Sequence, residues 1–300
     1  MKTIGIIAEY NPFHNGHALQ VDLVRQHAGP DAALVIVMSG SFTQRGEPAV
    51  VDKWARTRMA LAMGASLVIE LPFAYAASSA ERFATGGVQC LLATGVVGEL
   101  AFGSEAEDRT ALGRSASILT DEPPLFKETL RAQLDLGRSF PAARQTAVAA
   151  CLSESFENGA PFPDMRSDEH AAVTSGAALL GTANNILAIE YLKALNRFGQ
   201  GRMRPWTHMR KGQSYTESDL DKADRLASAT AIRARIESSG ASPAKIIQEL
   251  AAHMPPAALG ILMEQLSAGR GPVFPSMAAP IILALLGSET PERVDRIAGM

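Results

Sequence analysis

The chain has 300 residues, of which 47% are hydrophobic and 20% are charged, and its formal net charge at pH 7 is −3. This composition is typical of a folded globular protein and excludes a disordered or collagen-like chain. Because the chain is not basic overall, any nucleic-acid partner would have to be held by a local cluster of Lys and Arg.

Strands and helices alternate through the first 120 residues. An apolar run at residues 3–10 predicts a strand buried on both faces, and a second buried strand is expected at 32–40. A third and a fourth strand are expected at 66–72 and 99–105. Helical patterns separate these strands, and the helices are expected at residues 16–29, 52–64, 78–95 and 108–119. Units of roughly 30 residues of this kind predict right-handed crossovers and an α/β fold with a parallel, doubly wound sheet.

After residue 120 this alternation ends. The chain then predicts interrupted helices at 121–156, a polar loop at 155–170, a helix at 184–195, a weak fifth strand at 203–210 interrupted by Pro205, and a helix at 228–236 capped by Ser228. From residue 243 the pattern is helical, with breaks at 254–256 and 269–276. We expect one α/β domain over residues 1–236, with a largely helical insertion at about 121–180, and a helical part over 237–300.

The cysteines and the N-terminal sequence indicate the cellular compartment in which the protein is expected. Cys90 and Cys151 both stand in apolar or alanine-rich surroundings, which favours free thiols in a reducing environment. No signal-peptide pattern opens the chain, and no apolar run approaches the roughly 20 residues that a membrane-spanning helix needs. We therefore expect a cytoplasmic protein with no membrane partner.

The stretch EYNPFHNGH, residues 9–17, lies between the first predicted strand and the first predicted helix. In open α/β sheets, ligands bind beyond the carboxyl ends of the strands and near helix N-termini. A helix that begins at about Gly16 directs N–H groups and partial positive charge outward, and glycine lets a ligand approach the backbone. His14 and His17 could then donate hydrogen bonds to phosphate oxygens.

Two other interpretations of the histidine pair stay open. Zinc would need a third and a fourth ligand, and the remaining histidines are scattered with no Cys or carboxylate at metal spacing. We therefore predict no resident metal. The other interpretation is that both histidines are satisfied by local hydrogen bonds beside a turn and bind no ligand.

Two short motifs resemble a known superfamily. FHNGH resembles the H-x-G-H signature of the HIGH-type nucleotidyltransferases, and SATAIR, residues 228–233, resembles their S-x-T-x-I-R motif. Longer stretches, in order across about residues 3–236, resemble the bacterial tRNA(Met) cytidine acetate ligase family. These stretches are GIIAEYNPFHNGH, SGSFTQRGEPAVVDKWARTRMAL, GASLVIELPFAYAASSAERFA, FGSE, NNILAIEYLKAL and ASATAIR.

The resemblance implies a Rossmann-like HIGH nucleotidyltransferase fold and an ATP-dependent ligase. Such an enzyme converts acetate to acetyl-adenylate, releases pyrophosphate, and acetylates N4 of the wobble cytidine of elongator tRNA(Met). Mg²⁺ is expected to accompany ATP. Members of the family continue past the length of this chain into a basic helical tail, so the resemblance supports adenylation more directly than tRNA binding. The oligomeric state stays open.

The resemblance also implies roles for individual residues. His14 and His17 would stabilise the α-phosphate and the leaving pyrophosphate, and Gly103 would let the adenine or ribose approach. Arg210 and Asn185 would contact the nucleotide, with Asn184 as the neighbouring alternative. The implied ATP-binding residues are Ile7, Ala8, Glu9, Tyr10, Asn11, Pro12, Phe13, His14, Asn15, Gly16, His17, Ala18, Leu19, Gln20, Gly103, Asn185, Arg210, Ser228, Thr230 and Arg233.

The polar segment at residues 39–56 is a candidate for the acetate pocket and the acceptor cytidine. Its candidate residues are Gln44, Arg45, Asp52 and Lys53. The alternative is a solvated connection in which the aspartate caps the following helix. Phe73, Tyr75 and Phe83 are predicted to pack in the protein rather than to stack on bases. A local basic patch is available for RNA, formed by Arg202, Arg204, Arg210, Lys211, Arg225, Arg233 and Arg235.

Two other functions remain possible on the sequence. One is a nucleotidyltransferase that adenylylates a small phosphate ester, although such enzymes are usually shorter. The other is a nucleotide- or RNA-binding protein without turnover, which would not need both histidines.

Overall fold

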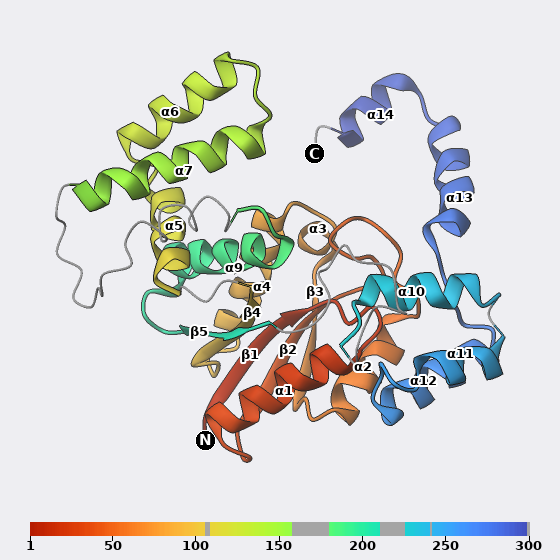
Figure 1. The fold of residues 1–300 in the computed structure, drawn as a ribbon. Coiled ribbons are helices and arrows are strands. Elements are labelled where there is room, and N and C mark those ends of the chain that lie inside the picture. Colours follow the sequence, from red (N-terminus) through yellow and green to blue (C-terminus); the bar gives the residue numbers. More distant parts are fainter. Residues whose placement is uncertain (106–108, 158–179, 211–225, 241, 299–300) are drawn as a thin grey trace.

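The computed structural model describes residues 1–105, 109–157, 180–210, 226–240 and 242–298. Five parallel strands form one sheet in the order β3-β2-β1-β4-β5 (Figure 1). Their bounds are Thr3–Ala8 for β1, Ala33–Ser39 for β2, Leu67–Leu71 for β3, Glu99–Ser104 for β4 and Arg204–Met209 for β5. The strand order reverses between β1 and β4, which is the position where open α/β sheets bind ligands. The predicted doubly wound parallel sheet is confirmed.

Helices cover both faces of this sheet (Figure 1). Those of the α/β units are α1 (Asn15–Ala28), α2 (Lys53–Ala62), α3 (Phe73–Ala76), α4 (Ala80–Ala93) and α5 (Arg109–Asp121). The next are α6 (Pro124–Asp135), α7 (Phe140–Glu157) and α9 (Ala183–Ala194), which a π-helical turn, η1 (Leu195–Gly199), continues. The chain then forms α10 (Ala229–Ser238), α11 (Pro243–Leu250), α12 (Pro256–Ser267), α13 (Pro275–Gly287) and α14 (Pro291–Ala298).

Two apolar cores lie against the two faces of the sheet. Alternation along β1 directs Ile7 into the core shared with α4, α5, α7 and α9, and it directs Ile4 and Ile6 into the core shared with α1, α2, α10, α11 and α12. Buried residues of α11 and α12, such as Leu250 and Leu262, belong to the second core. The domain boundary at residue 236 stays a prediction.

Most expected elements are confirmed, and the exceptions have local causes. The first strand ends at Ala8 instead of residue 10, because Tyr10 has a positive φ of 47° that breaks the extended backbone. β5 forms although it contains Pro205, because among the described strands it lies at the edge of the sheet, where its one neighbour is β4. Of the loop predicted at 155–170, the first three residues belong to α7, and the rest lie outside the described residues.

The last two helices differ from the others. α13 and α14 extend away from the sheet (Figure 1), and large apolar side chains of α13, including Ile281 and Leu283, are exposed. None of the described helices has the length and the apolar character that crossing a bilayer requires.

Candidate active site

A cavity of about 350 Å³ opens at the carboxyl edge of the sheet. The ends of β1, β4 and β5 line it, together with the first turn of α1, one face of α9 and the loop after β2. The predicted residues that line it are Ile7, Ala8, Glu9, Tyr10, Asn11, His14, Gly16, His17, Leu19, Gln20, Gln44, Arg45, Gly103 and Arg210. The structure therefore brings together most of the predicted nucleotide contacts.

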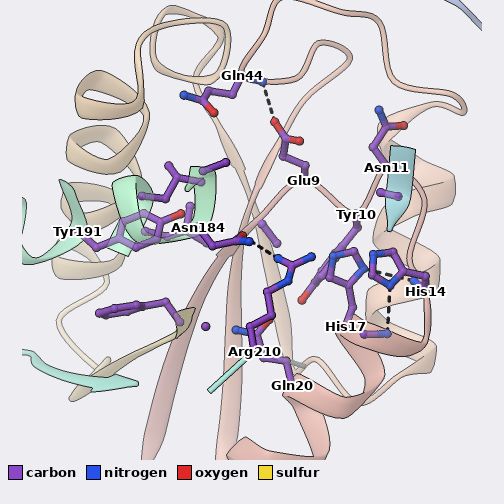
Figure 2. Close-up of a pocket in the computed structure, with 18 of the residues that line it drawn as sticks. Glu9, Tyr10, Asn11, His14, His17, Gln20, Gln44, Asn184, Tyr191 and Arg210 are labelled. Atoms are coloured by element: carbon purple, nitrogen blue, oxygen red, sulfur yellow. Dashed lines mark hydrogen bonds between the residues drawn. The ribbon is translucent and has the colours of Figure 1, made fainter. Parts of the chain in front are cut away.

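His14 and His17 form the first turn of α1. The Nδ1 atom of His14, the N-cap residue, accepts a hydrogen bond from the backbone N–H of Gly16 at 3.0 Å. The backbone N–H of His14 in turn donates to Nδ1 of His17 at 3.3 Å (Figure 2). This is a reciprocal capping box built from two imidazoles. Because each Nδ1 is an acceptor, a neutral ring carries its hydrogen on Nε2.

The environment keeps both rings neutral. Burial lowers the pKa of His14 to about 3, and the charges of Arg210 and Arg233 act in the same direction. Burial also lowers the pKa of His17 well below its usual value, with contributions from His14 and Arg210. The free site thus presents two Nε2–H donors, a helix N-terminus and two nearby guanidinium groups, which suits an anion such as phosphate.

Gly16 has a steric role that the motif alone does not reveal. A Cβ atom at this position would lie 2.8 Å from Cε1 and 3.0 Å from Nδ1 of His14. The shorter distance is one that Cβ atoms essentially never show, so any other residue at position 16 would force the His14 ring to shift, and glycine makes room for it.

The two adjacent asparagines of α9 have different surroundings. The Asn184 side chain lines the cavity and accepts a hydrogen bond from Nη1 of Arg210 at 2.7 Å (Figure 2). It also donates to the Glu105 carboxylate. Asn185 is buried behind it, where its Oδ1 accepts from the Ser104 hydroxyl and from the Glu105 N–H, both at 2.9 Å. The geometry therefore places Asn184 at the cavity, whereas Asn185 stabilises the end of β4 through its hydrogen bonds.

The candidate acceptor loop divides into two halves. Gln44 and Arg45 line the cavity. Asp52 instead caps α2 by accepting from the Ala55 N–H at 2.7 Å, and Lys53 pairs with Glu70 at 2.6 Å. Neither Asp52 nor Lys53 is among the residues that line the cavity. The capping alternative is confirmed for Asp52.

The second motif lies at the N-terminus of α10. Ser228 is the N-cap and accepts from the Ala231 N–H at 3.0 Å. Arg233 donates to the carbonyl oxygen of Asn11 at 2.9 Å and to the Thr230 hydroxyl at 3.4 Å. Arg233 thus joins the second motif to the first, while Leu226, Ala227 and Ala229 are the residues of this segment that line the cavity.

Other predicted residues support the site without facing it. Pro12 and Phe13 are buried, and Ala18 packs against the second core. The Asn15 side chain donates to the carbonyl oxygen of Ala252 at 2.8 Å, which ties α1 to the turn that follows α11. These residues position the histidine turn.

Several residues at the site were not predicted. Leu187 and Tyr191 line the cavity at the helical spacing that begins at Asn184, so the periodicity of α9 held a signal for them. His208 lines it next to Gly103, whose added Cβ would lie 3.2 Å from Cε1 of His208. Arg56 is fully buried, donates to the carbonyl oxygen of Glu9 at 2.6 Å, and hydrogen-bonds the carbonyl oxygen of Gly40. Nothing local in the sequence indicates this role of Arg56.

The aromatic and basic predictions have mixed outcomes. Phe83 is buried and Tyr75 packs against the first core, whereas Phe73 is 65% exposed and packs edge-on against Phe42, with ring centroids 5.7 Å apart. In the basic patch, Arg202 and Arg204 are exposed, and Arg235 forms an ion pair with Glu249, with Nη1 3.6 Å from Oε1. Lys211 and Arg225 lie outside the described residues.

Within the described ranges, no three His, Cys, Asp or Glu side chains lie close enough to hold a metal ion.

Comparison with known proteins gives consistent matches. The family model described as HIGH Nucleotidyl Transferase matches residues 1–300. The chain is 41% identical over 298 residues to the tRNA(Met) cytidine acetate ligase of Acetivibrio thermocellus, covering 99% of this chain and 66% of that protein. It is 39% identical over 300 residues to the enzyme of the same name from Halothermothrix orenii, covering 100% and 66%. The chain thus spans slightly less than two thirds of these relatives.

Two solved structures of Thermotoga maritima TmcAL are also similar. The apo structure, form I, aligns with a TM-score of 0.83 at 36% identity and covers 97% of this chain and 63% of that chain. The structure described as bound with alpha-thio ATP, form II, aligns with a TM-score of 0.76 at 37% identity and covers 92% and 58%. The resemblance seen in the sequence is confirmed by these matches.

Proposed function

Because this chain belongs to the HIGH nucleotidyl transferase family, we propose that it adenylates a carboxylate with ATP, and that the carboxylate is acetate. The acetyl group then passes to N4 of the wobble cytidine of elongator tRNA(Met). The names of the two bacterial relatives support this substrate pair, and the alpha-thio ATP bound to the Thermotoga maritima protein supports the nucleotide. The setting of such a reaction is the cytoplasm.

The histidine turn is the observation that carries the proposal. Two neutral imidazoles with their Nε2–H groups available lie at the N-terminus of α1, beside the switch point of the sheet. Donors fixed before the reaction stabilise charge that develops in a transition state, because they need no reorganisation. In phosphoryl transfer, positioning and charge stabilisation of this kind supply most of the catalysis.

In the adenylation step, an acetate oxygen attacks the α-phosphorus, and the bond from that phosphorus to the bridging oxygen breaks as pyrophosphate leaves. His14 and His17 donate to the α-phosphate and to the leaving pyrophosphate. Arg210, held by Asn184, contacts the nucleotide, and the backbone at Gly103 lets the adenine or ribose approach. The α10 N-terminus, with Ser228, Thr230 and Arg233 next to the cavity-lining Ala227 and Ala229, is assigned to the distal phosphates by the motif resemblance.

Mg²⁺ accompanies the ATP in this proposal. Since no cluster of metal ligands exists within the described ranges, the ion would be held mainly by phosphate oxygens and water, as is common for Mg²⁺ with nucleotides. Gln44 and Arg45 border the part of the cavity left for acetate and for the cytosine, which must leave its stack to enter.

Labelled acetate tests the proposal directly. The protein is incubated with ATP, Mg²⁺ and labelled acetate, with and without elongator tRNA(Met), and the digested tRNA is analysed by mass spectrometry. We expect labelled N4-acetylcytidine and one pyrophosphate for each acetyl group transferred. Pyrophosphate release that does not depend on acetate would contradict the proposal.

A further inference from the structure

Glu9 is the only acidic residue among the described residues that line the cavity. Its Oε1 atom accepts a hydrogen bond from the backbone N–H of Gln44 at 2.7 Å, and Figure 2 shows the side chain pointing toward that loop. Its Oε2 atom makes no hydrogen bond within the part of the chain that the structure describes. One carboxylate oxygen is therefore anchored, and the other remains available to a ligand.

A carboxylate is unfavourable in a site built for ATP and acetate, because both substrates are anions and like charges repel strongly where water is excluded. Burial raises the pKa of Glu9, while the Gln44 N–H and the charges of Arg233, Arg56 and Arg45 oppose that increase. The charge of Glu9 also helps to raise the pKa of Tyr191, for which burial is the main cause. The natural partner of such a group is a substrate atom that carries hydrogen.

The backbone around Glu9 is held from several sides. Arg56 donates to the carbonyl oxygen of Glu9 at 2.6 Å, and Tyr10 adopts a left-handed φ that costs free energy for a residue with a side chain. The Asn11 side chain accepts from the Val50 N–H at 2.8 Å, and its carbonyl oxygen accepts from Arg233. Three other segments thus fix this short stretch, as a site that positions a reacting group requires.

We propose that Glu9 accepts the exocyclic amino group of the acceptor cytosine and removes a proton from it during acetyl transfer. The inference rests on the proposed function. A carboxylate is the side chain that pairs with cytosine N4, which carries two hydrogens. Glu9 also accepts its hydrogen bond from Gln44, which precedes Arg45 in the loop that borders the part of the cavity proposed for acetate and cytosine.

The step conserves atoms and charge. The N4 nitrogen attacks the carbonyl carbon of acetyl-adenylate, a C–N bond forms, and the C–O bond to the phosphate breaks. AMP leaves with that electron pair, and one N4 proton moves to Oε2 of Glu9 and later to solvent. Positioned bases of this kind contribute about 10²- to 10⁴-fold to a rate.

The test separates transfer from adenylation. Transfer is measured with chemically prepared acetyl-adenylate and elongator tRNA(Met), and adenylation by acetate-dependent ATP–pyrophosphate exchange. Glu9→Gln keeps an oxygen for the Gln44 N–H but accepts no proton, and Glu9→Asp keeps the carboxylate on a shorter arm. We expect Glu9→Gln to slow transfer at least about 100-fold, and by at least tenfold more than exchange. Glu9→Asp should recover part of this loss.

Two further measurements sharpen the result. The wild-type transfer rate should rise with pH as Glu9 loses its proton, and the Glu9→Gln variant should lack that rise. His17→Ala is the matched control, and it should slow exchange more than transfer.

Equal losses in exchange and transfer would overturn the inference, as would transfer by Glu9→Gln within threefold of wild type. A raised KM for ATP with normal transfer would assign Glu9 to the adenine instead. Absent exchange in the wild type would reject the proposed function at the adenylation step. The prepared acetyl-adenylate would still test Glu9 in that case.

Discussion

The imidazole rings of His14 and His17 lie with their centroids 3.8 Å apart and their planes tilted by 33°. Two imidazolium ions could not share this space without strong repulsion, so besides burial, the proximity of His14 lowers the pKa of His17. The hydrogen bonds that cap α1 use Nδ1 of both rings, so helix capping and tautomer selection are the same interaction. The local fold thereby prepares both Nε2–H groups for a phosphate.

Replacement of His17 by alanine should remove one donor from the proposed transition state. Loss of one such donor typically lowers kcat by about 10²- to 10³-fold. The measurement is acetate-dependent ATP–pyrophosphate exchange. His14→Asn is a useful companion, because its side-chain oxygen can still cap the Gly16 N–H while the imidazole donor is lost. Exchange within threefold of wild type in both variants would show that the histidines do not act on the phosphates.

Replacement of Gly16 by alanine should displace the His14 ring, because the new Cβ would lie 2.8 Å from Cε1. A shift of about 1 Å in a reacting group can reduce a rate roughly 100-fold, so we expect exchange to fall by about 10- to 100-fold. Gly260→Ala in α12 is the control, since a Cβ there meets nothing within 4 Å. It should stabilise the protein by about 0.5–1 kcal/mol. Normal exchange in Gly16→Ala would disprove the steric role of Gly16.

Folding stability should decrease as the pH falls from 6.5 toward 3. The pKa of His14 is about 3 in the folded protein and 6.5 in the unfolded chain, so the unfolded chain binds more protons in that range. Integration from pH 7 to pH 5 gives a loss of about 2 kcal/mol for His14. The raised pKa of Glu9 acts in the opposite direction, because its contribution is lost as the pH rises through its folded value.

Urea denaturation of the wild type and of His14→Asn at pH 7 and pH 5 isolates the histidine contribution. The variant should lose less stability over this interval than the wild type, since Glu9 is present in both proteins. Equal losses would mean that the His14 pKa is not depressed in the folded state.

The adjacent asparagines should give different phenotypes. Asn184→Ala removes the partner of Arg210 at the cavity and should raise KM for ATP about tenfold, in line with a hydrogen bond to a charged group. Asn185→Ala removes the acceptor used by the Ser104 hydroxyl and the Glu105 N–H and should lower the free energy of unfolding by about 1–3 kcal/mol. Steady-state kinetics and thermal denaturation of both variants check the assignment. The reverse pattern would restore Asn185 as the nucleotide contact.

The sequence by itself determined the sheet and the place of the site. A short apolar run rich in β-branched residues and closed by Gly40, such as residues 32–40, is typical of a buried parallel strand, and the strand predicted there is confirmed. The histidine turn was also predictable, because the capping geometry of His14, Gly16 and His17 depends on residues within one helical turn. Hydrogen bonds between residues within one helical turn depend mainly on the local spacing of those residues and only weakly on distant parts of the chain.

Only the tertiary structure decided which residues face the cavity. Asn184 and Asn185 differ by about 100° around α9, and packing against the other helices fixes that rotation. Asp52 and Gln44 belong to one polar loop, but the start of α2 uses Asp52 as its cap while Gln44 lies beside Glu9. The buried contact of Arg56 with Glu9 joins residues 47 positions apart. Such contacts depend on how the elements pack together, so the spacing of residues along the chain carries no signal for them.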